Sequence, residues 1–210
     1  MTEVVVFATG AALAAADPLP PGAIVVAADG GADSALALGL RVDVAVGDFD
    51  SIQPDGLAAL EAAGTRIERH PSAKDATDLE LALDEALRLG AKRVLVLGSD
   101  SGRLDHLLGT LLLLASDAWA GVELDALLGP ASVHVIRGER TLLGEPGETV
   151  SLFALGGPAA GVATAGLRYP LAGATLEPGT SLGVSNEFTA AEARVSVASG
   201  VVVAVRPGLN

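Results

Sequence analysis

The segment Ile24–Asp33 has the sequence IVVAADGGAD and contains the features that decide the fold. Its first five residues are all apolar, which is typical of a strand in a parallel sheet that is covered on both faces. Asp29-Gly30-Gly31 follows this strand at once, and a helical pattern begins at Ala32. We therefore predict a strand, a tight glycine turn and a helix, which is the repeating unit of an α/β sheet.

The same alternation continues through the first 125 residues. Thr77 and Glu80 are three residues apart just before a stripe of apolar residues, and this capping-box pattern predicts the start of a helix. Residues 1–125 are thus predicted to form an α/β domain, a parallel sheet with helices on both faces. The predicted strands are 4–7, 24–28, 42–46 and 94–97, and the predicted helices are 32–38, 54–63, 79–89 and 104–115.

The pattern changes after Asp125. Short apolar runs are now separated by turns rich in Gly and Pro, which is typical of a small antiparallel sandwich. Residues 126–210 are therefore predicted to form an all-β C-terminal sandwich. The predicted strands are 132–136, 149–155, 174–176, 194–197 and 201–205.

The composition of the chain argues against several kinds of partner. The formal net charge is −13, and residues 1–125 carry 20 acidic and 8 basic residues, whereas a face that binds nucleic acid is basic. No apolar run approaches the ~18 residues that span a bilayer. The first residues, MTEVVVFATG, lack the basic start of a secretory signal, and the chain has no Cys for disulfides or thiolate metal sites. We expect a cytoplasmic protein without nucleic-acid or membrane partners.

Two polar clusters directly follow predicted strands, where ligands of an open α/β sheet bind. Asp29-Gly30-Gly31 could bring the backbone close to a phosphate, or it could be only a tight turn, and the sequence leaves both alternatives open. The segment Gly47-Asp48-Phe49-Asp50-Ser51 places two carboxylates at a strand end. A local turn there could direct both carboxylates to one Mg²⁺, and a purely structural role for them is the less favoured alternative.

A third polar cluster lies at the start of a predicted helix, in Lys74–Glu80. Asp75 and Asp78 are three residues apart, so they would share one face of the helix. The helix dipole alone is a sufficient reason for either acid at this position. Lys74 stands next to them and could hold a phosphate that a metal also binds.

The fourth cluster is Gly98–His106, a Gly/Ser-rich loop that opens an apolar helix. Arg103 is suited to bidentate contact with a phosphate. Asp105 and His106 stand in the first turn of the helix, where His106 could also be a simple polar cap. Taken together, the four clusters indicate a site for Mg²⁺ and a nucleotide, because bound Mg²⁺ would offset the repulsion between carboxylates and phosphates. The chain lacks G-x-x-x-x-G-K-[ST], so it is not a Walker-type ATPase.

Six motifs, in this order, resemble those of the thiamine pyrophosphokinase family. The four clusters contain A-D-G-G, G-D-F-D-S, K-D-A-T-D-L-E and G-R-L-D-H. In the second half, T-A-G-L-R-Y-P-L begins at Thr164 and S-N-E begins at Ser185. The resemblance extends from about residue 24 to about residue 205.

The resemblance implies an α/β catalytic domain, a β-sandwich, and a homodimer with active sites at the subunit interface. It also implies the transfer of a pyrophosphoryl group from ATP to the hydroxyl of thiamine, with Mg²⁺ as cofactor. The implied metal ligands are Asp48, Asp50 and Asp75, and the residues implied to position the reacting groups are Asp78, Arg103 and Asp105. The implied ATP-binding residues are Asp29, Gly30, Gly31, Ser51, Lys74, Thr77, Arg103 and His106. The residues implied to bind thiamine are Tyr169 of the partner subunit, Ser185 and Asn186.

Three alternatives remain beside this interpretation. Asp48-Phe49-Asp50 imitates the D-x-D nucleophile of aspartyl phosphatases, but that class leaves the second half of the chain unexplained. A related Mg²⁺-dependent pyrophosphokinase could act on another alcohol, such as a pterin. The chain could also bind a nucleotide or thiamine without catalysis. The acidic first half favours a cationic substrate such as thiamine, and the aromatic ring of Tyr169 suits the flat rings of thiamine.

Overall fold

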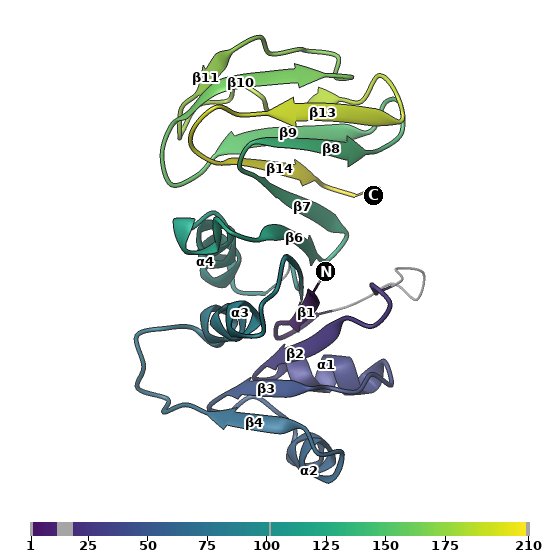
Figure 1. The fold of residues 1–210 in the computed structure, drawn as a ribbon, viewed down its shortest axis with the longest axis vertical. Helices are drawn as coiled ribbons and strands as arrows, with labels where there is room; N and C mark the ends of the chain where they lie inside the picture. Colours follow the sequence, from purple (N-terminus) through teal and green to yellow (C-terminus); the bar gives the residue numbers. More distant parts are fainter. Residues whose placement is uncertain (1, 12–18, 101, 209–210) are drawn as a thin grey trace. The chain divides into compact units, whose positions relative to one another are not determined.

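The computed structural model describes residues 2–11, 19–100 and 102–208 of the 210-residue chain. The chain divides into two compact units (Figure 1). Unit 1 comprises Met1–Leu107 and Leu124–Gly129, and unit 2 comprises Leu108–Glu123 and Pro130–Asn210. Leu124–Gly129 thus belongs to unit 1, although the preceding segment of the chain belongs to unit 2.

Unit 1 is built on a parallel sheet. The strand order is β5, β1, β2, β3, β4, and each of these neighbouring pairs is parallel. A further strand, β6, lies next to β5. The bounds are β1 Glu3–Phe7, β2 Ile24–Ala28, β3 Val44–Gly47, β4 Arg66–Arg69, β5 Arg93–Gly98 and β6 Glu123–Leu128.

Helices cover both faces of this sheet, as the sequence predicts (Figure 1). α1 and α2 pack on one face through Ala32, Ala35 and Leu60, which form one core with Val5 and Phe7 of β1. α3 packs against β1, β2 and β3 and lies on the opposite face. The bounds are α1 Gly31–Ala37, α2 Pro54–Ala62, α3 Asp78–Arg88 and α4 Leu104–Leu114. A single 3₁₀ turn, Asp117–Trp119, follows α4.

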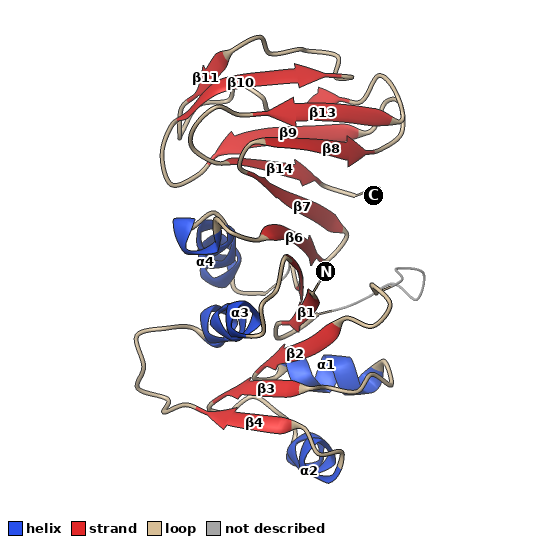
Figure 2. Cartoon of the chain, viewed as in Figure 1, coloured by secondary structure: helices blue, strands red, loops and turns tan. Residues whose placement is uncertain are grey.

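Unit 2 is an antiparallel sandwich from Pro130 onward, with no helix in its described residues beyond that point (Figure 2). One sheet has the order β12, β9, β14, β7, and the other has the order β11, β10, β13, β8. Ile136, Leu152 and Val202 of the first sheet form one core with Val162 and Val195 of the second. The predicted sandwich is therefore confirmed. The bounds are β7 Ala131–Ile136, β8 Glu139–Leu143, β9 Thr149–Ala154, β10 Ala159–Ala165, β11 Ala174–Leu176, β12 Asn186–Glu187, β13 Glu192–Ser196 and β14 Val202–Arg206.

The predicted elements agree with the observed ones to within one or two residues. All four predicted helices form, and β2 and β11 have the predicted bounds. The structure adds five strands that the apolar patterns did not predict: β4, β6, β8, β10 and β12.

Candidate active site

Acidic residues meet where β2 and β3 end. The two strands pair in a register that places Ala28 opposite Val46, and the Asp29 N–H donates to Val46 O at 2.9 Å. Asp29 therefore leaves β2 beside the last residues of β3, which lead into Asp48. Parallel strands end at the same edge of a sheet, so the register alone brings these two carboxylates together.

Asp29, Asp48 and Asp78 form an acidic group, which we call the acid triad. Each offers one carboxylate oxygen, and these oxygens all lie within 4.8 Å of one another. Asp29 is 4% exposed, and its Oδ1 has no hydrogen-bond partner among the described residues. A buried carboxylate oxygen without a partner is costly. The three carboxylates of the triad could therefore hold a cation.

Gly47 makes room for the triad. Its φ of +152° lies in a region that residues with side chains rarely adopt. A Cβ at this position would stand 3.1 Å from both the Asp29 Cβ and Asp78 Oδ1. The glycine of the G-D-F-D-S motif is therefore explained by the close approach of Asp29 and Asp78 to the backbone.

Lys74 partly neutralises the triad. Its Nζ lies 3.0 Å from Asp78 Oδ1 and 3.4 Å from Asp48 Oδ2. The first contact is an ion pair by distance, although Asp78 Oδ1 lacks a hydrogen bond of good geometry. Burial alone would lower the pKa of Lys74, but the ion pairs with Asp78 and Asp48 outweigh it and raise that pKa. The lysine is therefore a cation at neutral pH.

The pKa of Asp48 lies below its ordinary value. A hydrogen bond from Ser72 is the largest cause, and the Asp50 N–H and Lys74 act in the same direction, whereas burial opposes them. Asp48 is thus ionised at neutral pH and available as a ligand. Three carboxylates against one ammonium leave an excess of two negative charges in the cluster, which matches one divalent cation.

The donor set of the triad also suits Mg²⁺. This ion prefers carboxylate oxygens and octahedral geometry, in which two ligands are at most about 4.2 Å apart. The carboxylate oxygens of the triad all lie within 4.8 Å of one another, which is close to this spacing. The three carboxylates therefore fit the ion that the sequence predicts.

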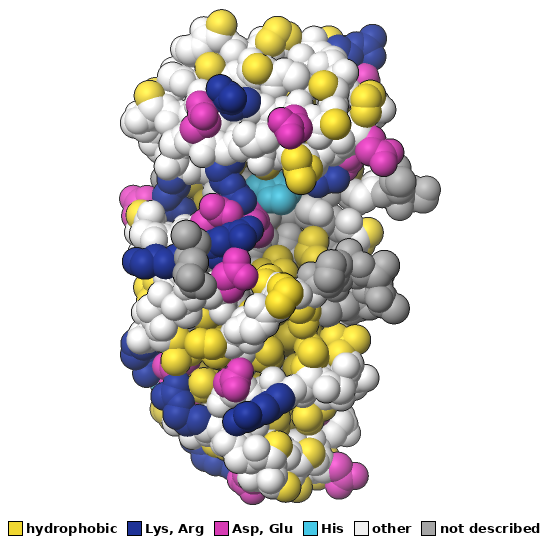
Figure 3. Space-filling view, turned by 45° about the vertical axis from the view of Figure 1, so that its right-hand side comes forward, with side chains coloured by type: hydrophobic (Ala, Val, Ile, Leu, Met, Phe, Trp, Pro, Cys, Tyr) yellow, Lys and Arg dark blue, Asp and Glu magenta, His cyan; other side chains and the backbone are white. Residues whose placement is uncertain are grey.

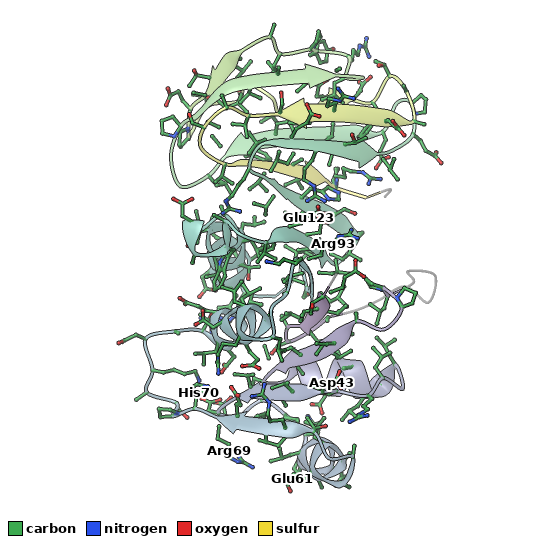
Figure 4. The ribbon with its side chains drawn as sticks, in the orientation of Figure 1. Asp43, Glu61, Arg69, His70, Arg93 and Glu123 are labelled. Carbon is green, nitrogen blue, oxygen red and sulfur yellow. The ribbon has the colours of Figure 1, made fainter. Side chains whose placement is uncertain are left out.

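Phe49 anchors the loop that carries Asp48 and Asp50. It is buried and has a φ of +61°, which is unusual for a bulky residue and is tolerated where the surroundings enforce it. The Arg69 guanidinium lies 5.2 Å from the centre of its ring, and Arg69 also pairs with Glu61 of α2 at 3.6 Å (Figure 4). Asp50 on the far side of Phe49 is exposed and lies outside the triad.

Ser51 and Asp50 contact each other, since the Ser51 hydroxyl donates to Asp50 Oδ1 at 2.9 Å. At the start of α3, Thr77 is the N-cap, and its Oγ1 accepts from the Glu80 N–H at 3.2 Å. The predicted cap is therefore confirmed. Asp75, two residues before Thr77, is exposed and does not belong to the triad.

The two glycines after Asp29 have different surroundings. A Cβ on Gly31 would overlap the Phe7 carbonyl at the end of β1. A Cβ on Gly30 would meet only Ser51 O at 3.2 Å and side-chain atoms at 3.4 Å. Packing of α1 against β1 is therefore a sufficient reason for Gly31, whereas Gly30, although also buried, has no backbone overlap of this kind.

Arg103 and Asp105 form a bidentate ion pair at the start of α4. Arg103 Nε lies 3.2 Å from Asp105 Oδ1, and Nη2 lies 2.5 Å from Oδ2. The hydrogen bonds from Arg103 lower the pKa of Asp105, and they also raise the pKa of Arg103. His106 is exposed, and its N–H donates to Arg103 O at 3.1 Å. Ser101 of the preceding loop lies outside the described residues.

In unit 2, Tyr169 and the S-N-E motif lie together. Tyr169 is 57% exposed, and its backbone forms two hydrogen bonds with the buried side chain of Asn186. Ser185 is exposed, has a φ of +55°, and donates its N–H to Ser151 Oγ at 3.0 Å. The structure thus brings together the three residues that the sequence assigns to thiamine.

Comparison with known proteins identifies the family of the chain. The family model for the catalytic domain of thiamin pyrophosphokinase matches residues 21–122, and the model for its vitamin B1 binding domain matches residues 133–202. The chain belongs to the thiamine pyrophosphokinase family. The Bacillus subtilis thiamine pyrophosphokinase is 27% identical over 183 residues, which is 86% of each chain.

Solved structures of thiamine pyrophosphokinases share the fold. The crystal structure of the enzyme from Bacillus subtilis superposes with a TM-score of 0.83 at 23% identity, over 100% of both chains. A thiamin pyrophosphokinase family protein from Enterococcus faecalis gives a TM-score of 0.82 at 27% identity, also over 100% of both chains. The predicted fold class is therefore confirmed. Within the described residues, no helix combines the length and apolarity that crossing a membrane requires.

Three of the six motifs each contribute one residue to the acid triad. Asp48 and Asp78 were both predicted as site residues, and Asp29 was predicted to contact ATP rather than a metal. Its place in the triad follows from the pairing of β2 with β3, which the order of motifs along the chain does not show. The one sequence signal is that Asp29, like Asp48, directly follows a buried apolar run.

Proposed function

We propose that this chain is a thiamine diphosphokinase, which uses ATP and thiamine to make thiamine diphosphate and AMP. The observation that carries the proposal is the combination of two family matches with one acid triad in unit 1. In this reaction the thiamine hydroxyl oxygen attacks the β-phosphorus of ATP. The bond from that phosphorus to the oxygen of the α-phosphate breaks, and AMP leaves with the bond's electron pair.

The hydroxyl proton needs an acceptor, and two carboxylates are candidates. Asp78 belongs to the triad, and Asp105 pairs with Arg103. The hydrogen bonds from Arg103 lower the pKa of Asp105 and weaken it as a base, and the ion pair of Asp78 with Lys74 weakens that carboxylate in the same sense, so both stay candidates. In such transfers the protein contributes mainly positioning and charge neutralisation.

We propose that Mg²⁺ binds at the triad, with Asp29, Asp48 and Asp78 as its ligands. Bound there, the ion would neutralise phosphate charge and polarise the transferred group. The resemblance to the family gives Asp48, Asp50 and Asp75 instead. Asp48 is common to both sets, and the two sets make different predictions for substitutions of Asp29 and Asp75.

The remaining ATP contacts are proposed from the motifs and their positions. Lys74, between Asp48 and Asp78, would turn its ammonium to a phosphate once a divalent ion has replaced it as their counter-ion. Arg103 would exchange part of its pairing with Asp105 for phosphate oxygens. The other proposed contacts are Asp29, Gly30, Gly31, Ser51, Thr77 and His106.

Thiamine is proposed to bind at the exposed ring of Tyr169, with Ser185 and Asn186 as further members of the site. An exposed aromatic face suits a flat, cationic molecule. The net charge of −13 would also favour the approach of a cation over that of an anion. We expect the reaction to take place in the cytoplasm, the compartment that supplies ATP.

We also propose a homodimer in which Tyr169 of the partner subunit completes each site. Leu104, Leu108 and Leu112 recur every fourth residue along α4, and all three side chains are exposed. Figure 3 shows further hydrophobic side chains, in yellow, on the surface of the molecule. Such a stripe is typical of a helix face that a second chain covers.

Incubation of the purified chain with ATP, thiamine and Mg²⁺, followed by chromatography of the products, tests the activity. The proposal predicts equal amounts of AMP and thiamine diphosphate, and none of either when Mg²⁺ is chelated. Formation of ADP would exclude a pyrophosphokinase, and AMP formation with a pterin alcohol but not with thiamine would favour the other acceptor. Binding of both substrates without any product would favour the non-catalytic alternative.

A further inference from the structure

The side chain of Asn186 makes three hydrogen bonds, all with backbone groups. Its Nδ2 donates to Tyr169 O at 2.7 Å, and its Oδ1 accepts from the N–H groups of Tyr169 at 3.0 Å and Glu187 at 2.9 Å. The residue is 2% exposed. We propose that Asn186 is a positioning residue of the thiamine site, which acts through Tyr169 and does not itself contact the substrate. This inference rests on the proposed function of Tyr169.

The backbone around Asn186 explains why a side chain takes this role. Asn186 and Glu187 form β12, whose backbone pairs with Val150 and Thr149 of β9. The segment before Tyr169 runs along β12 and the residue after it, because Arg168 N–H donates to Glu187 O at 2.9 Å and Leu167 bridges to Phe188. At Tyr169 the backbone ladder ends. The amide of Asn186 then supplies both a donor and an acceptor, as a facing peptide group would.

This engagement leaves little of Asn186 for a ligand. An amide oxygen accepts two hydrogen bonds, and both positions are taken by backbone N–H groups. The amide nitrogen donates two, and one goes to Tyr169 O. A side chain that is 2% exposed also offers almost no surface for contact. These hydrogen bonds favour a positioning role over the direct contact with thiamine that the family resemblance implies.

The ring of Tyr169 is contacted by Arg168, the preceding residue of the same motif. Arg168 lies 5.6 Å from the centre of the ring, and its Nη1 pairs with Glu187 Oε2 at 2.8 Å. Asn186 thus fixes the backbone of Tyr169, and Glu187 fixes the cation beside its ring. Fixing an aromatic side chain before binding reduces the entropy that the ligand must offset, and this lowers the KM for a substrate that packs on it.

A double-mutant cycle on the KM for thiamine tests the inference. Asn186→Ala is expected to raise this KM by about tenfold, the loss expected for a pair of ordinary hydrogen bonds, and to leave the KM for ATP and kcat within about twofold. In a Tyr169→Ala background, Asn186→Ala should add less than about twofold, because the residue through which it acts is gone. Effects that multiply in the double variant would show direct contact and overturn the inference.

Two further variants separate positioning from loss of folding. Asn186→Ser keeps a hydroxyl that can donate and accept but is too short to reach all three partners, so its KM for thiamine should lie between those of the wild type and Asn186→Ala. Should Asn186→Ala not fold, the cycle is run with Asn186→Ser. Ser196→Ala removes another hydrogen bond from a side chain to the backbone of unit 2, at 3.4 Å to Ala163 O, and should leave the KM for thiamine unchanged.

A spectroscopic measurement distinguishes this inference from the proposed function. Tyr169 is the only tyrosine of the chain, so fluorotyrosine labelling gives a single ¹⁹F resonance. Without substrate, this resonance should shift or broaden in Asn186→Ala and not in Ser196→Ala. An unchanged resonance would overturn the positioning role alone. A resonance in the wild type that does not respond to saturating thiamine, together with an unchanged KM in Tyr169→Ala, would overturn the proposed role of Tyr169 and the inference with it.

Discussion

Lys74 Nζ lies 3.0 Å from Asp78 Oδ1 and so places a protein cation inside the group of carboxylates that we propose as the metal site. Carboxylates this close repel one another unless a cation stands between them. Lys74 supplies that cation when no metal is bound, and the same ammonium is within reach of Asp48. A lysine in this position holds the site together before the metal arrives and competes with the metal for the same oxygens.

Removal of the Lys74 ammonium should therefore strengthen metal binding, whereas substitution of most residues in a metal site weakens it. Lys74→Met is expected to bind Mn²⁺ at least about threefold more tightly in the absence of ATP, because one positive charge no longer opposes the ion. Its melting temperature in chelator should fall and should recover when Mn²⁺ is added. Isothermal titration and thermal melts give both quantities.

Lys92→Met provides a matched control for this measurement. Lys92 is the only other lysine of the chain and is exposed, so its loss removes the same charge away from the triad. This variant should bind Mn²⁺ as the wild type does. Unchanged or weaker Mn²⁺ binding in Lys74→Met would show that the ammonium does not compete with the metal.

The two proposed ligand sets are separated by Asp29 and Asp75. If the triad binds the ion, Asp29→Asn should weaken Mn²⁺ binding by at least about tenfold, whereas Asp75→Asn, at an exposed position outside the triad, should have little effect. Asp48→Asn should weaken binding under either set. The reverse order of effects at Asp29 and Asp75 would favour the set that the family motifs imply, and Asp50→Asn would then behave like Asp75→Asn.

Much of unit 1 is predictable because its strands are apolar on both faces. β2 was predicted with its observed bounds since Ile24–Ala28 contains no polar residue. β4 was missed because three of its four residues, Arg66, Glu68 and Arg69, are charged. It is the edge strand of the sheet, where one side of the ladder is open and charged residues are common.

The individual residues of the site could be predicted from the sequence, but their arrangement in space could not. The acids at strand ends identify Asp29, Asp48 and Asp78 as candidates, since polar residues directly after buried strands need a reason. Which of them share an ion depends on the register of β2 against β3 and on the point where α3 begins. Both are long-range properties of the fold, and local sequence patterns do not contain them. The hydrogen bonds of Asn186 were missed for the same reason, because Tyr169 lies 17 residues away in the chain.

The proposed homodimer predicts complementation between two defective variants. Asp48→Asn should lack the metal site, and Tyr169→Ala should bind thiamine weakly. In a heterodimer of the two, one of the two sites would receive its intact Asp48 and its intact Tyr169 from different subunits. Random mixing should therefore restore about a quarter of the wild-type activity at low thiamine. Subunits are exchanged by mild denaturation and refolding, and each variant treated alone is the control. No recovery in a mixture that contains heterodimers would place both residues in one subunit's site.

The two glycines of A-D-G-G should respond differently to alanine. In Gly31→Ala the new methyl group would overlap the Phe7 carbonyl, which is backbone and cannot rotate away. We expect α1 to be displaced from β1 and the free energy of unfolding to fall by about 1–3 kcal/mol, the range for overpacked sites. In Gly30→Ala the nearest atom is Ser51 O at 3.2 Å, a tight contact without overlap, so the free energy of unfolding should fall less than in Gly31→Ala.

The same pair tests whether a nucleotide approaches this turn. If ATP packs against the backbone at Gly30, Gly30→Ala should raise the KM for ATP several-fold and lower the melting temperature less than Gly31→Ala does. Gly109→Ala is the control for both variants, because no atom lies within 4 Å of a Cβ at this helical position; it should be neutral or stabilise α4 by up to about 1 kcal/mol. If the KM for ATP in Gly30→Ala equals that of the wild type, ATP does not pack against Gly30. The motif would then require only Gly31, because of its contact with β1.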